Sequence, residues 1–300
     1  MCVDLLDLLR RRVAIPQADI PSGRLVDLPG RGTTFVTDTP GPHPDAPTVL
    51  LLHGLATTGL LTWYPAIAPL SERYRVVTMD QRWHGQGIVS EHFSLPDCAD
   101  DVAALVDLLE LGEVILVGYS FGSIVAQRVW RQHPGIVAGL VLCATTDRFR
   151  STVTERVFHD TLRLAMTSSR RLARSRVAVH AARQAARVLD LQAEDLHAWA
   201  LREFRSTSGW ALGPALAALG RHHSRPWLGQ IDVPTAVVIG LRDRVFPPAD
   251  QVALARRIPG ATIHEVEAGH AGCVFEADAF VAGVLEALAT VNARQRDRAG

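Results

Sequence analysis

The sequence predicts an α/β fold, in which a mostly parallel sheet is covered by helices on both faces and a helical segment is inserted near the middle of the chain. Short, almost continuously apolar runs, typical of strands buried on both faces, alternate with segments whose apolar residues recur at helical spacing. The alternation stops over residues 147–225 and resumes at Thr235. With 300 residues, of which 48% are apolar, the chain can form one large domain of this kind.

The expected elements begin with a hairpin. Residues 24–28 and 33–37 are short β-patterns joined by Pro29-Gly30-Arg31-Gly32, whose glycines supply turn conformations. After a proline-rich loop, strands are expected at 48–52, 74–79, 114–117, 137–143, 235–240 and 262–266. Helices are expected at 63–72, 95–111, 121–133, 248–257 and 273–291, followed by a frayed tail.

The interruption divides the chain into a core and a cap. We expect residues 1–146 and 226–300 to form the core domain, and residues 147–225 to form a helical cap, or lid. Such an insertion lies over the carboxyl ends of the strands, where open α/β sheets bind ligands. The segment is rich in arginine. That favours a solvated helical face, and a site for an anionic group is the alternative.

Composition and charge exclude several classes of partner. The net charge is zero, so no overall field favours nucleic acid or a membrane surface, and no apolar run reaches the length of a membrane span. The four cysteines are scattered without a C-x-x-C pair, which is typical of a reducing compartment. The first residues place acids where a signal peptide carries positive charge. We therefore expect a cytoplasmic protein.

No cofactor or metal is expected. The chain carries neither a phosphate-binding loop nor a dinucleotide fingerprint. The histidines His222, His223, His264 and His270 lack an H-E-x-x-H pattern or flanking carboxylates at ligand spacing, so we do not interpret them as metal ligands.

The most informative stretch is Gly118-Tyr119-Ser120-Phe121-Gly122, between an expected strand and an expected helix. A serine at the apex of a sharp strand-to-helix turn is the pattern of a nucleophile elbow. The turn forces the serine into a strained backbone conformation, and the glycines stand where neighbouring chain comes too close for a side chain. A glycine-rich turn with an incidental serine fits this context less well.

A serine hydroxyl is a poor nucleophile at neutral pH, so it needs a base, and the base needs an acid that orients it. His270 follows the last expected strand and Asp243 follows the one before, so both lie past carboxyl ends of strands, as Ser120 does. Their chain order, Ser, Asp, His, is that of nucleophile-elbow enzymes. Asp147, after the strand at 137–143, is a second candidate for the acid, and we favour Asp243.

Acyl transfer also needs hydrogen-bond donors for the oxyanion that develops during the reaction. One expected donor is the backbone N–H of Phe121, at the start of a helix. The other should come from the loop that begins His53-Gly54-Leu55. We select the N–H of Leu55, because the glycine before it lets the peptide turn inward. His53 is then expected to be structural and to hydrogen-bond within the loop.

With His53-Gly54, the serine elbow, Asp243 and His270 in place, the chain resembles the α/β-hydrolases over about residues 24–292. It is most similar to bacterial esterase-like members with a helical cap inserted after the sixth strand. The resemblance implies a mixed, mostly parallel sheet of about eight strands flanked by helices. It also implies Ser120, His270 and Asp243 as nucleophile, base and acid.

One motif of that family is altered here. The family often carries D-x-R-G-H-G-x-S after its fourth strand, and the corresponding run is Asp80-Gln81-Arg82-Trp83-His84-Gly85-Gln86-Gly87. Trp83 replaces a glycine and Gly87 replaces the serine. Because the motif is structural, we expect an altered local loop with Trp83 as packing or as a pocket wall, and unchanged chemistry.

The serine itself selects among the relatives of this fold. Haloalkane dehalogenases and epoxide hydrolases use an aspartate at this position, and dienelactone hydrolases use a cysteine. Ser120 favours hydrolysis of a carboxylic ester, thioester or lactone through an acyl-enzyme. A cofactor-free haloperoxidase or perhydrolase and a C–C bond hydrolase are the alternatives. A non-catalytic ligand-binding protein of the fold fits less well, because the triad is complete.

The expected partner is a small acyl substrate that the sequence does not identify. Candidate substrate-binding residues are Trp63, Tyr119, Phe149, Trp210 and Phe246, although such aromatic side chains serve equally well as ordinary packing. The sequence does not give an oligomeric state, and a homodimer is left open.

Overall fold

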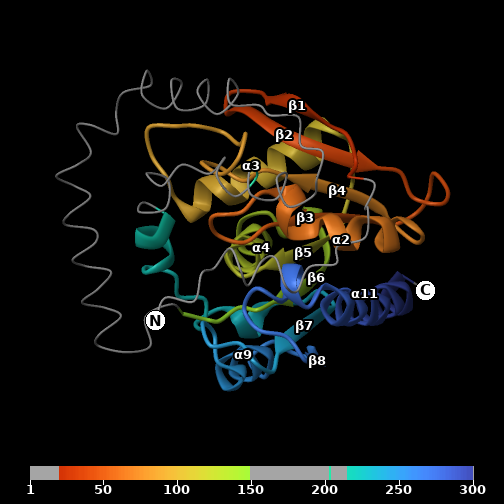
Figure 1. The fold of residues 1–300 in the computed structure, drawn as a ribbon, viewed down its shortest axis with the longest axis vertical. Helices are drawn as coiled ribbons and strands as arrows, with labels where there is room; N and C mark the ends of the chain where they lie inside the picture. Colours follow the sequence, from red (N-terminus) through yellow and green to blue (C-terminus); the bar gives the residue numbers. More distant parts are fainter. Residues whose placement is uncertain (1–19, 149–202, 204–214, 300) are drawn as a thin grey trace, which may run out of the picture.

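The computed structural model describes residues 20–148, 203 and 215–299 (Figure 1). Within these residues, eight strands form one sheet in the order β1-β2-β4-β3-β5-β6-β7-β8. Their bounds are β1 (Gly23–Leu28), β2 (Gly32–Thr39), β3 (Thr48–Leu52), β4 (Arg75–Met79), β5 (Val114–Tyr119), β6 (Val137–Cys143), β7 (Thr235–Gly240) and β8 (Thr262–Val266). β2 pairs antiparallel with β1 and β4, and the other neighbouring pairs are parallel. The predicted mostly parallel α/β sheet is confirmed.

Helices cover both faces of the sheet (Figure 1). α3 (Leu95–Leu108), α4 (Phe121–Gln132) and α9 (Pro248–Ala255) lie on one face, and α2 (Gly59–Ser71) and α11 (Ala277–Ala299) lie on the other. Shorter helices are η1 (Pro134–Ile136), η2 (Leu228–Gln230) and α10 (Gly272–Phe275). In β6, Leu140 and Leu142 belong to the first apolar cluster and Val141 and Cys143 to the second. The strand is apolar throughout because both of its faces are buried.

The start of α2 differs from the prediction. The helix begins at Gly59 rather than at Trp63. Thr58 caps it, since its side chain accepts the N–H of Leu61 at 3.1 Å. The carboxylate of Asp80, from the end of the next strand, accepts the N–H of Gly59 at 2.9 Å. A partner so distant in sequence leaves no local signal, which explains the misplaced boundary.

The predicted C-terminal helix with a frayed tail is wrong in two respects. The chain forms α10 and then α11, with a break at Glu276, and α11 continues to Ala299. Arg294 donates to the carbonyl oxygen of Gly260, and Arg298 donates to that of Asp232. These bonds attach the last turns of the helix to the loops before β8 and β7.

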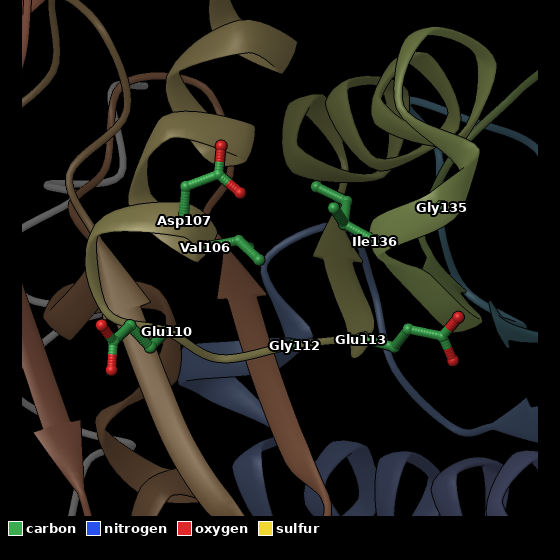
Figure 2. Close-up of a pocket in the computed structure, with 7 residues that line it drawn as sticks. All are labelled: Val106, Asp107, Glu110, Gly112, Glu113, Gly135 and Ile136. Carbon is green, nitrogen blue, oxygen red and sulfur yellow. The ribbon is translucent and has the colours of Figure 1, made fainter.

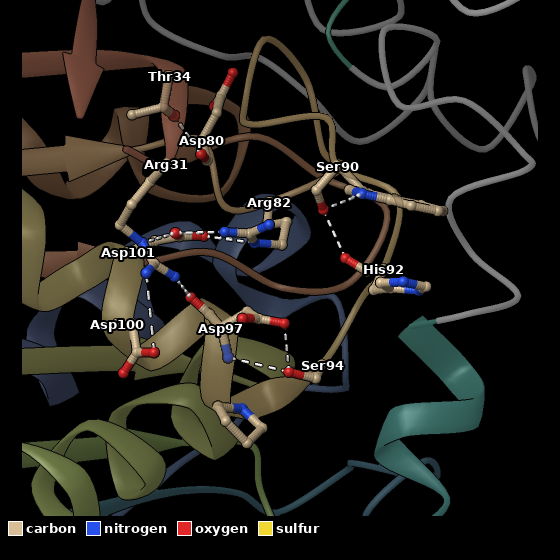
Figure 3. A network of polar contacts seen from close by, with 12 residues as sticks. Arg31, Thr34, Asp80, Arg82, Ser90, His92, Ser94, Asp97, Asp100 and Asp101 are labelled. Atoms are coloured by element: carbon tan, nitrogen blue, oxygen red, sulfur yellow. Dashed lines mark hydrogen bonds and ion pairs between the residues drawn. The ribbon is translucent and has the colours of Figure 1, made fainter. Parts of the chain in front are cut away.

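An ion-pair network anchors the segment that follows β4 (Figure 3). Arg82 donates to both carboxylate oxygens of Asp101, at 2.7 and 2.6 Å, and Arg31 from the hairpin turn donates to Asp101 at 2.5 Å. Asp101 is only 1% exposed. A buried carboxylate with two guanidinium partners is compensated in charge, and the fork geometry fixes the Arg82 backbone against α3.

The two ends of the predicted insertion meet. Arg148 and His223 form an antiparallel bridge, and the N–H of Ser224 donates to the carbonyl oxygen of Asp147 at 2.8 Å. The chain therefore leaves the sheet after β6 and returns beside the same point. Most of the expected helical cap lies outside the described residues, so the division into core and cap stays a prediction.

The described part of the chain contains neither a membrane-spanning helix nor a metal-binding cluster. None of its helices combines the length and apolar character that a membrane span needs. Nor does that part gather three or more His, Cys, Asp or Glu side chains in a metal-binding arrangement. Cys98, Cys143 and Cys273 are buried free thiols, as expected for Cys143.

Candidate active site

Ser120 stands at the turn between β5 and α4 in a left-handed conformation, with φ 51° and ψ −112°. Residues other than glycine rarely adopt this backbone conformation, so the predicted backbone strain is present. A Cβ on Gly118 would lie 2.4 Å from the backbone of Ser123, and one on Gly122 would lie 2.1 Å from the carbonyl oxygen of Leu52. Both glycines are therefore required by close backbone approach, as expected from the sequence.

The structure brings together the three side chains predicted as nucleophile, base and acid. Ser120 Oγ lies 3.0 Å from His270 Nε2, and His270 Nδ1 lies 2.8 Å from Asp243 Oδ2. An ionised carboxylate can only accept, so Nδ1 carries a proton. In the neutral imidazole Nε2 is then free of a proton and accepts from the serine hydroxyl. This arrangement can draw the proton from Ser120.

The Asp243 carboxylate is fully buried, and hydrogen bonds surround it. Oδ1 accepts the backbone N–H groups of Val245 at 2.8 Å and Phe246 at 2.9 Å. Oδ2 accepts from His270 and, at 3.3 Å, from the amide of Gln251. The side chain has 0% exposure, so these donors replace water around its charge.

Asp147, the second candidate for the acid, has other partners. Its Oδ2 accepts from Arg225 Nε at 2.9 Å and pairs with Arg257 Nε at 3.0 Å. The carboxylate that contacts His270 is that of Asp243. Asp147 instead joins the returning end of the insertion to the region after α9.

His53 organises the loop after β3. Its Nδ1 lies 2.7 Å from the carbonyl oxygen of Gly54, and its Nε2 accepts the N–H of Gln81 at 2.8 Å. These partners fix the proton on Nδ1 in a neutral ring. Burial, reinforced by the nearby His84, holds the pKa of His53 well below its usual value. The prediction of a structural histidine is confirmed.

The same contacts orient the Gly54–Leu55 peptide. The carbonyl oxygen of Gly54 is held by His53 Nδ1 and, at 2.9 Å, by the hydroxyl of Thr57. Since a peptide is planar and trans, the N–H of Leu55 points the opposite way. A Cβ on Gly54 would lie 3.9 Å from the Cβ of Ser120, so the loop runs beside the serine.

Phe121 is the first residue of α4, and its side chain is held by neighbouring rings. The first N–H groups of a helix have no acceptor within it, and the helix dipole favours negative charge there. The ring of Phe121 stacks on His84 with centroids 5.4 Å apart, and Phe93 lies 6.1 Å away. Burial lowers the pKa of His84 to about 4, so this support stays neutral.

Comparison with known proteins gives the family. The family model described as the alpha/beta hydrolase fold matches residues 47–277. The chain belongs to the α/β-hydrolase fold family.

Similar proteins of known name span nearly the same length as this hydrolase-fold chain. The 3-oxoadipate enol-lactonase 1 of Acinetobacter baylyi is 25% identical over 258 residues, which cover 84% of this chain and 91% of that protein. RutD of Escherichia coli O157:H7, provisionally assigned as a carbamate hydrolase, is 28% identical over 259 residues, which cover 84% of this chain and 95% of RutD. The solved structure of the enol-lactonase from Burkholderia xenovorans LB400 superposes with a TM-score of 0.69 at 24% identity, covering 89% of this chain and all of that one.

Two predicted substrate-binding residues of this α/β-hydrolase, Trp63 and Tyr119, are buried in the apolar core. Trp63 has 0% exposure and packs against Tyr119 and Phe280, with ring centroids 6.3 and 5.8 Å away. Its prediction as a substrate contact is wrong, because the start of α2 turns this ring into the core. Tyr119 is buried in the same cluster, and its hydroxyl donates to the carbonyl oxygen of His270 at 2.6 Å.

Of the other three predicted substrate-binding residues, the structure describes Phe246 alone. The ring of Phe246 stands edge-on to His270, with centroids 5.3 Å apart, so it is well placed beside the base. Phe149 and Trp210 lie outside the described residues.

Trp83, in the altered family motif, has a positive φ, a backbone conformation that favours glycine. Its φ is 68°, its N–H donates to the carbonyl oxygen of Ile88 at 2.8 Å, and its ring contacts Phe93. Its indole N–H donates to the hydroxyl of Ser90 at 3.2 Å. Of the two expectations, packing describes this residue.

The sequence did not point to Gln251 or Glu203. Gln251 is fully buried on α9, and a polar residue among the inward positions of that helix was the signal available. Glu203 accepts from the hydroxyl of Thr58 at 2.6 Å, which connects the inserted segment with the loop after β3. Nothing in the local sequence marks this pairing.

A separate pocket of about 340 Å³ lies at the other end of β5 (Figure 2). Its lining residues are Val106, Asp107, Glu110, Gly112, Glu113, Gly135 and Ile136. Residues 110–113 precede β5, whereas Ser120 follows it, so the pocket and the serine are at opposite edges of the sheet. Its three acidic residues, Asp107, Glu110 and Glu113, are therefore not part of the site around Ser120.

Proposed function

We propose that this chain is a serine hydrolase that cleaves a carboxylic ester, thioester or lactone through an acyl-enzyme on Ser120. The observation that carries the proposal is the pair of contacts at His270, 3.0 Å to Ser120 Oγ and 2.8 Å to Asp243 Oδ2. The family and the names of the relatives support hydrolysis of an ester-type bond, and an enol-lactonase is among those relatives.

The reaction begins with proton transfer. His270 Nε2 takes the proton of Ser120 Oγ as that oxygen attacks the substrate carbonyl. The imidazolium that forms is stabilised by the buried Asp243 carboxylate, which also keeps the ring in the tautomer with its proton on Nδ1. The fixed hydrogen bonds of Asp243 support this role, because they prevent the carboxylate from turning away.

The oxyanion needs two donors. The N–H of Phe121, at the start of α4, and the N–H of Leu55, opposite the anchored carbonyl of Gly54, supply them. His270 then gives its proton to the leaving group as the bond between that group and the carbonyl carbon breaks. Water attacks the acyl-enzyme with His270 as base again, and the acyl–Oγ bond breaks as Ser120 regains its proton from His270. Each of these groups belongs to the chain itself, so the steps require neither metal nor cofactor.

Residues 147–225 are proposed as a cap that selects the substrate. The pairing of Arg148 with His223 supports this division, since the segment leaves and rejoins the core at one point. The contact between Glu203 and Thr58 adds to it, because it brings the inserted segment to the loop that carries Leu55.

A panel of esters, thioesters, lactones and carbamates that vary in acyl length and leaving group tests the proposal. We expect turnover of at least one class by the wild type and none by Ser120→Ala. Equal turnover by Ser120→Ala would overturn it. Peracid formation from acetate and hydrogen peroxide, without ester hydrolysis, would instead favour the perhydrolase alternative.

A further inference from the structure

Tyr119 immediately precedes the proposed nucleophile, yet its side chain is directed into the core. Successive residues of a strand point to opposite faces, and the Tyr119 ring lies on the face covered by α2 and α11. It stands edge-on to Trp63 and Phe280, with centroids 6.3 and 5.2 Å away. The residue is only 4% exposed. These contacts hold the ring in one orientation, and the hydroxyl at its end is the polar group of this side chain.

The hydroxyl reaches the backbone of the proposed base. It donates to the carbonyl oxygen of His270, which lies 151 residues further along the chain, at 2.6 Å. Burial, with Cys273 beside the hydroxyl, raises the pKa of Tyr119 well above its usual range. The hydroxyl therefore remains a donor throughout the pH range in which an esterase is assayed.

The loop that carries His270 is built from small residues, Ala268-Gly269-His270-Ala271-Gly272. A cavity of about 10 Å³ lies there, lined in part by Tyr119, Ala268 and Gly269. Backbone bonds fix the residues on either side, from Arg242 N–H to the carbonyl of Ala268 and from Gly272 N–H to that of Gly269, each at 3.0 Å. Small side chains offer little contact area, so hydrogen bonds contribute strongly to fixing this loop. At His270, the bond from Tyr119 meets this need.

We propose that Tyr119 is a positioning residue for the base. Its hydroxyl fixes the His270 backbone, so that the imidazole keeps its contacts with Ser120 and Asp243 at the same time. This inference rests on the proposed function, because it assigns a task within the same reaction. A displacement of about 1 Å in a reacting group costs on the order of a hundredfold in rate, so a small loss of order at this loop is measurable.

Tyr119→Phe tests the assignment, since it removes the hydroxyl and keeps the ring that packs on Trp63 and Phe280. We expect kcat for an active ester to fall roughly tenfold to a hundredfold while KM stays nearly unchanged. The rate of labelling by a fluorophosphonate should fall in parallel, because that reaction also needs an aligned base. Circular dichroism and the thermal midpoint check that the variant is folded.

Tyr74→Phe is the matched control. Tyr74 is buried in the same apolar cluster and is 3% exposed, and the exchange likewise removes a tyrosine hydroxyl while it keeps the ring. Tyr74 precedes β4, whereas Ser120 and His270 follow the carboxyl ends of their strands. This variant is expected to keep the kcat, KM and labelling rate of the wild type.

A second measurement reports the geometry without turnover. The proton on His270 Nδ1 that faces Asp243 is expected as a far-downfield resonance in the NMR spectrum of the wild type and of Tyr74→Phe. In Tyr119→Phe it should be broadened or lost, because a looser ring exchanges its proton with water.

Three results would overturn the assignment. They are an unchanged kcat in Tyr119→Phe, an equal fall in Tyr74→Phe, and a raised KM at constant kcat, which would make Tyr119 a substrate contact. If the wild type neither hydrolyses esters nor is labelled, the proposed function itself is contradicted, and the positioning role of Tyr119 falls with it. This outcome is distinguishable from the three above, in which the wild type is active.

Discussion

Asp243→Asn is expected to reverse a hydrogen bond at His270 without changing the shape of the site. Oδ1 of Asp243 accepts the N–H groups of Val245 and Phe246 at 2.8 and 2.9 Å, so the asparagine oxygen is held there. Its amide NH2 then faces His270 Nδ1, which must become an acceptor. The ring proton moves to Nε2, and the nitrogen that faces Ser120 can no longer take a proton.

The wrong tautomer is expected to lower kcat by about 10⁴. At about 1.36 kcal/mol for each tenfold change, this corresponds to about 5.4 kcal/mol of lost transition-state stabilisation. Initial rates with a p-nitrophenyl ester give kcat and KM, and urea unfolding shows whether the fold is retained.

Asp147→Asn serves as the control for this exchange. Asp147 is also a buried carboxylate, but its partners are Arg225 and Arg257, so we expect wild-type kcat. The reasoning is refuted if Asp243→Asn keeps more than about a tenth of wild-type kcat, because the predicted residual kcat is about 10⁻⁴ of wild type. It is refuted equally if Asp147→Asn loses as much activity as Asp243→Asn.

Three further exchanges test the scaffold by urea unfolding. Gly122→Ala should cost about 3 kcal/mol or more, because its Cβ would lie 2.1 Å from the carbonyl oxygen of Leu52; wild-type stability would contradict this. Arg82→Met should cost about 3 kcal/mol, since it leaves the buried Asp101 undercompensated, and a cost near zero would refute the argument. The folded-state pKa of His84, about 4, lies below its usual 6.5, so its stabilising effect is complete above pH 6.5 and is lost as the pH falls toward 4. We expect the free energy of unfolding to fall by about 2 kcal/mol between pH 7 and 5 through His84, and His84→Asn should remove that part of its pH dependence.

Arg75→Met is the matched control for Arg82→Met. Arg75 makes the same two-pronged contact with Asp38, at 2.9 and 2.7 Å, but both side chains are partly exposed. We expect a cost below about 1 kcal/mol. Equal losses in the two variants would mean that burial does not set the strength of these pairs.

The strands and the serine elbow could be predicted because their causes are local. A strand buried on both faces has to be apolar at every position, as in Val137–Cys143, and its bounds were predicted correctly. The elbow needs small residues at fixed offsets from Ser120, and a Cβ added at Gly118 or Gly122 would lie 2.4 or 2.1 Å from backbone atoms. The order of Asp243 and His270 after successive strands was equally visible.

What the sequence missed depends on partners far along the chain. The early start of α2 depends on Asp80, and the burial of Trp63 follows from that start. The hydroxyl of Tyr119 meets His270 only when β5 and the loop after β8 are brought together. No periodicity in one segment encodes such contacts, so the sequence suggested a substrate residue where the structure has a bond to the base loop.

Covalent labelling of Ser120 tests the central claim most directly. Wild-type protein and Ser120→Ala are treated with a fluorophosphonate, and intact mass followed by peptide mapping locates the adduct. We predict one adduct per chain in the wild type, on the peptide that carries Ser120, and none in Ser120→Ala. A folded wild-type protein without an adduct, or an adduct that persists in Ser120→Ala, would contradict the account.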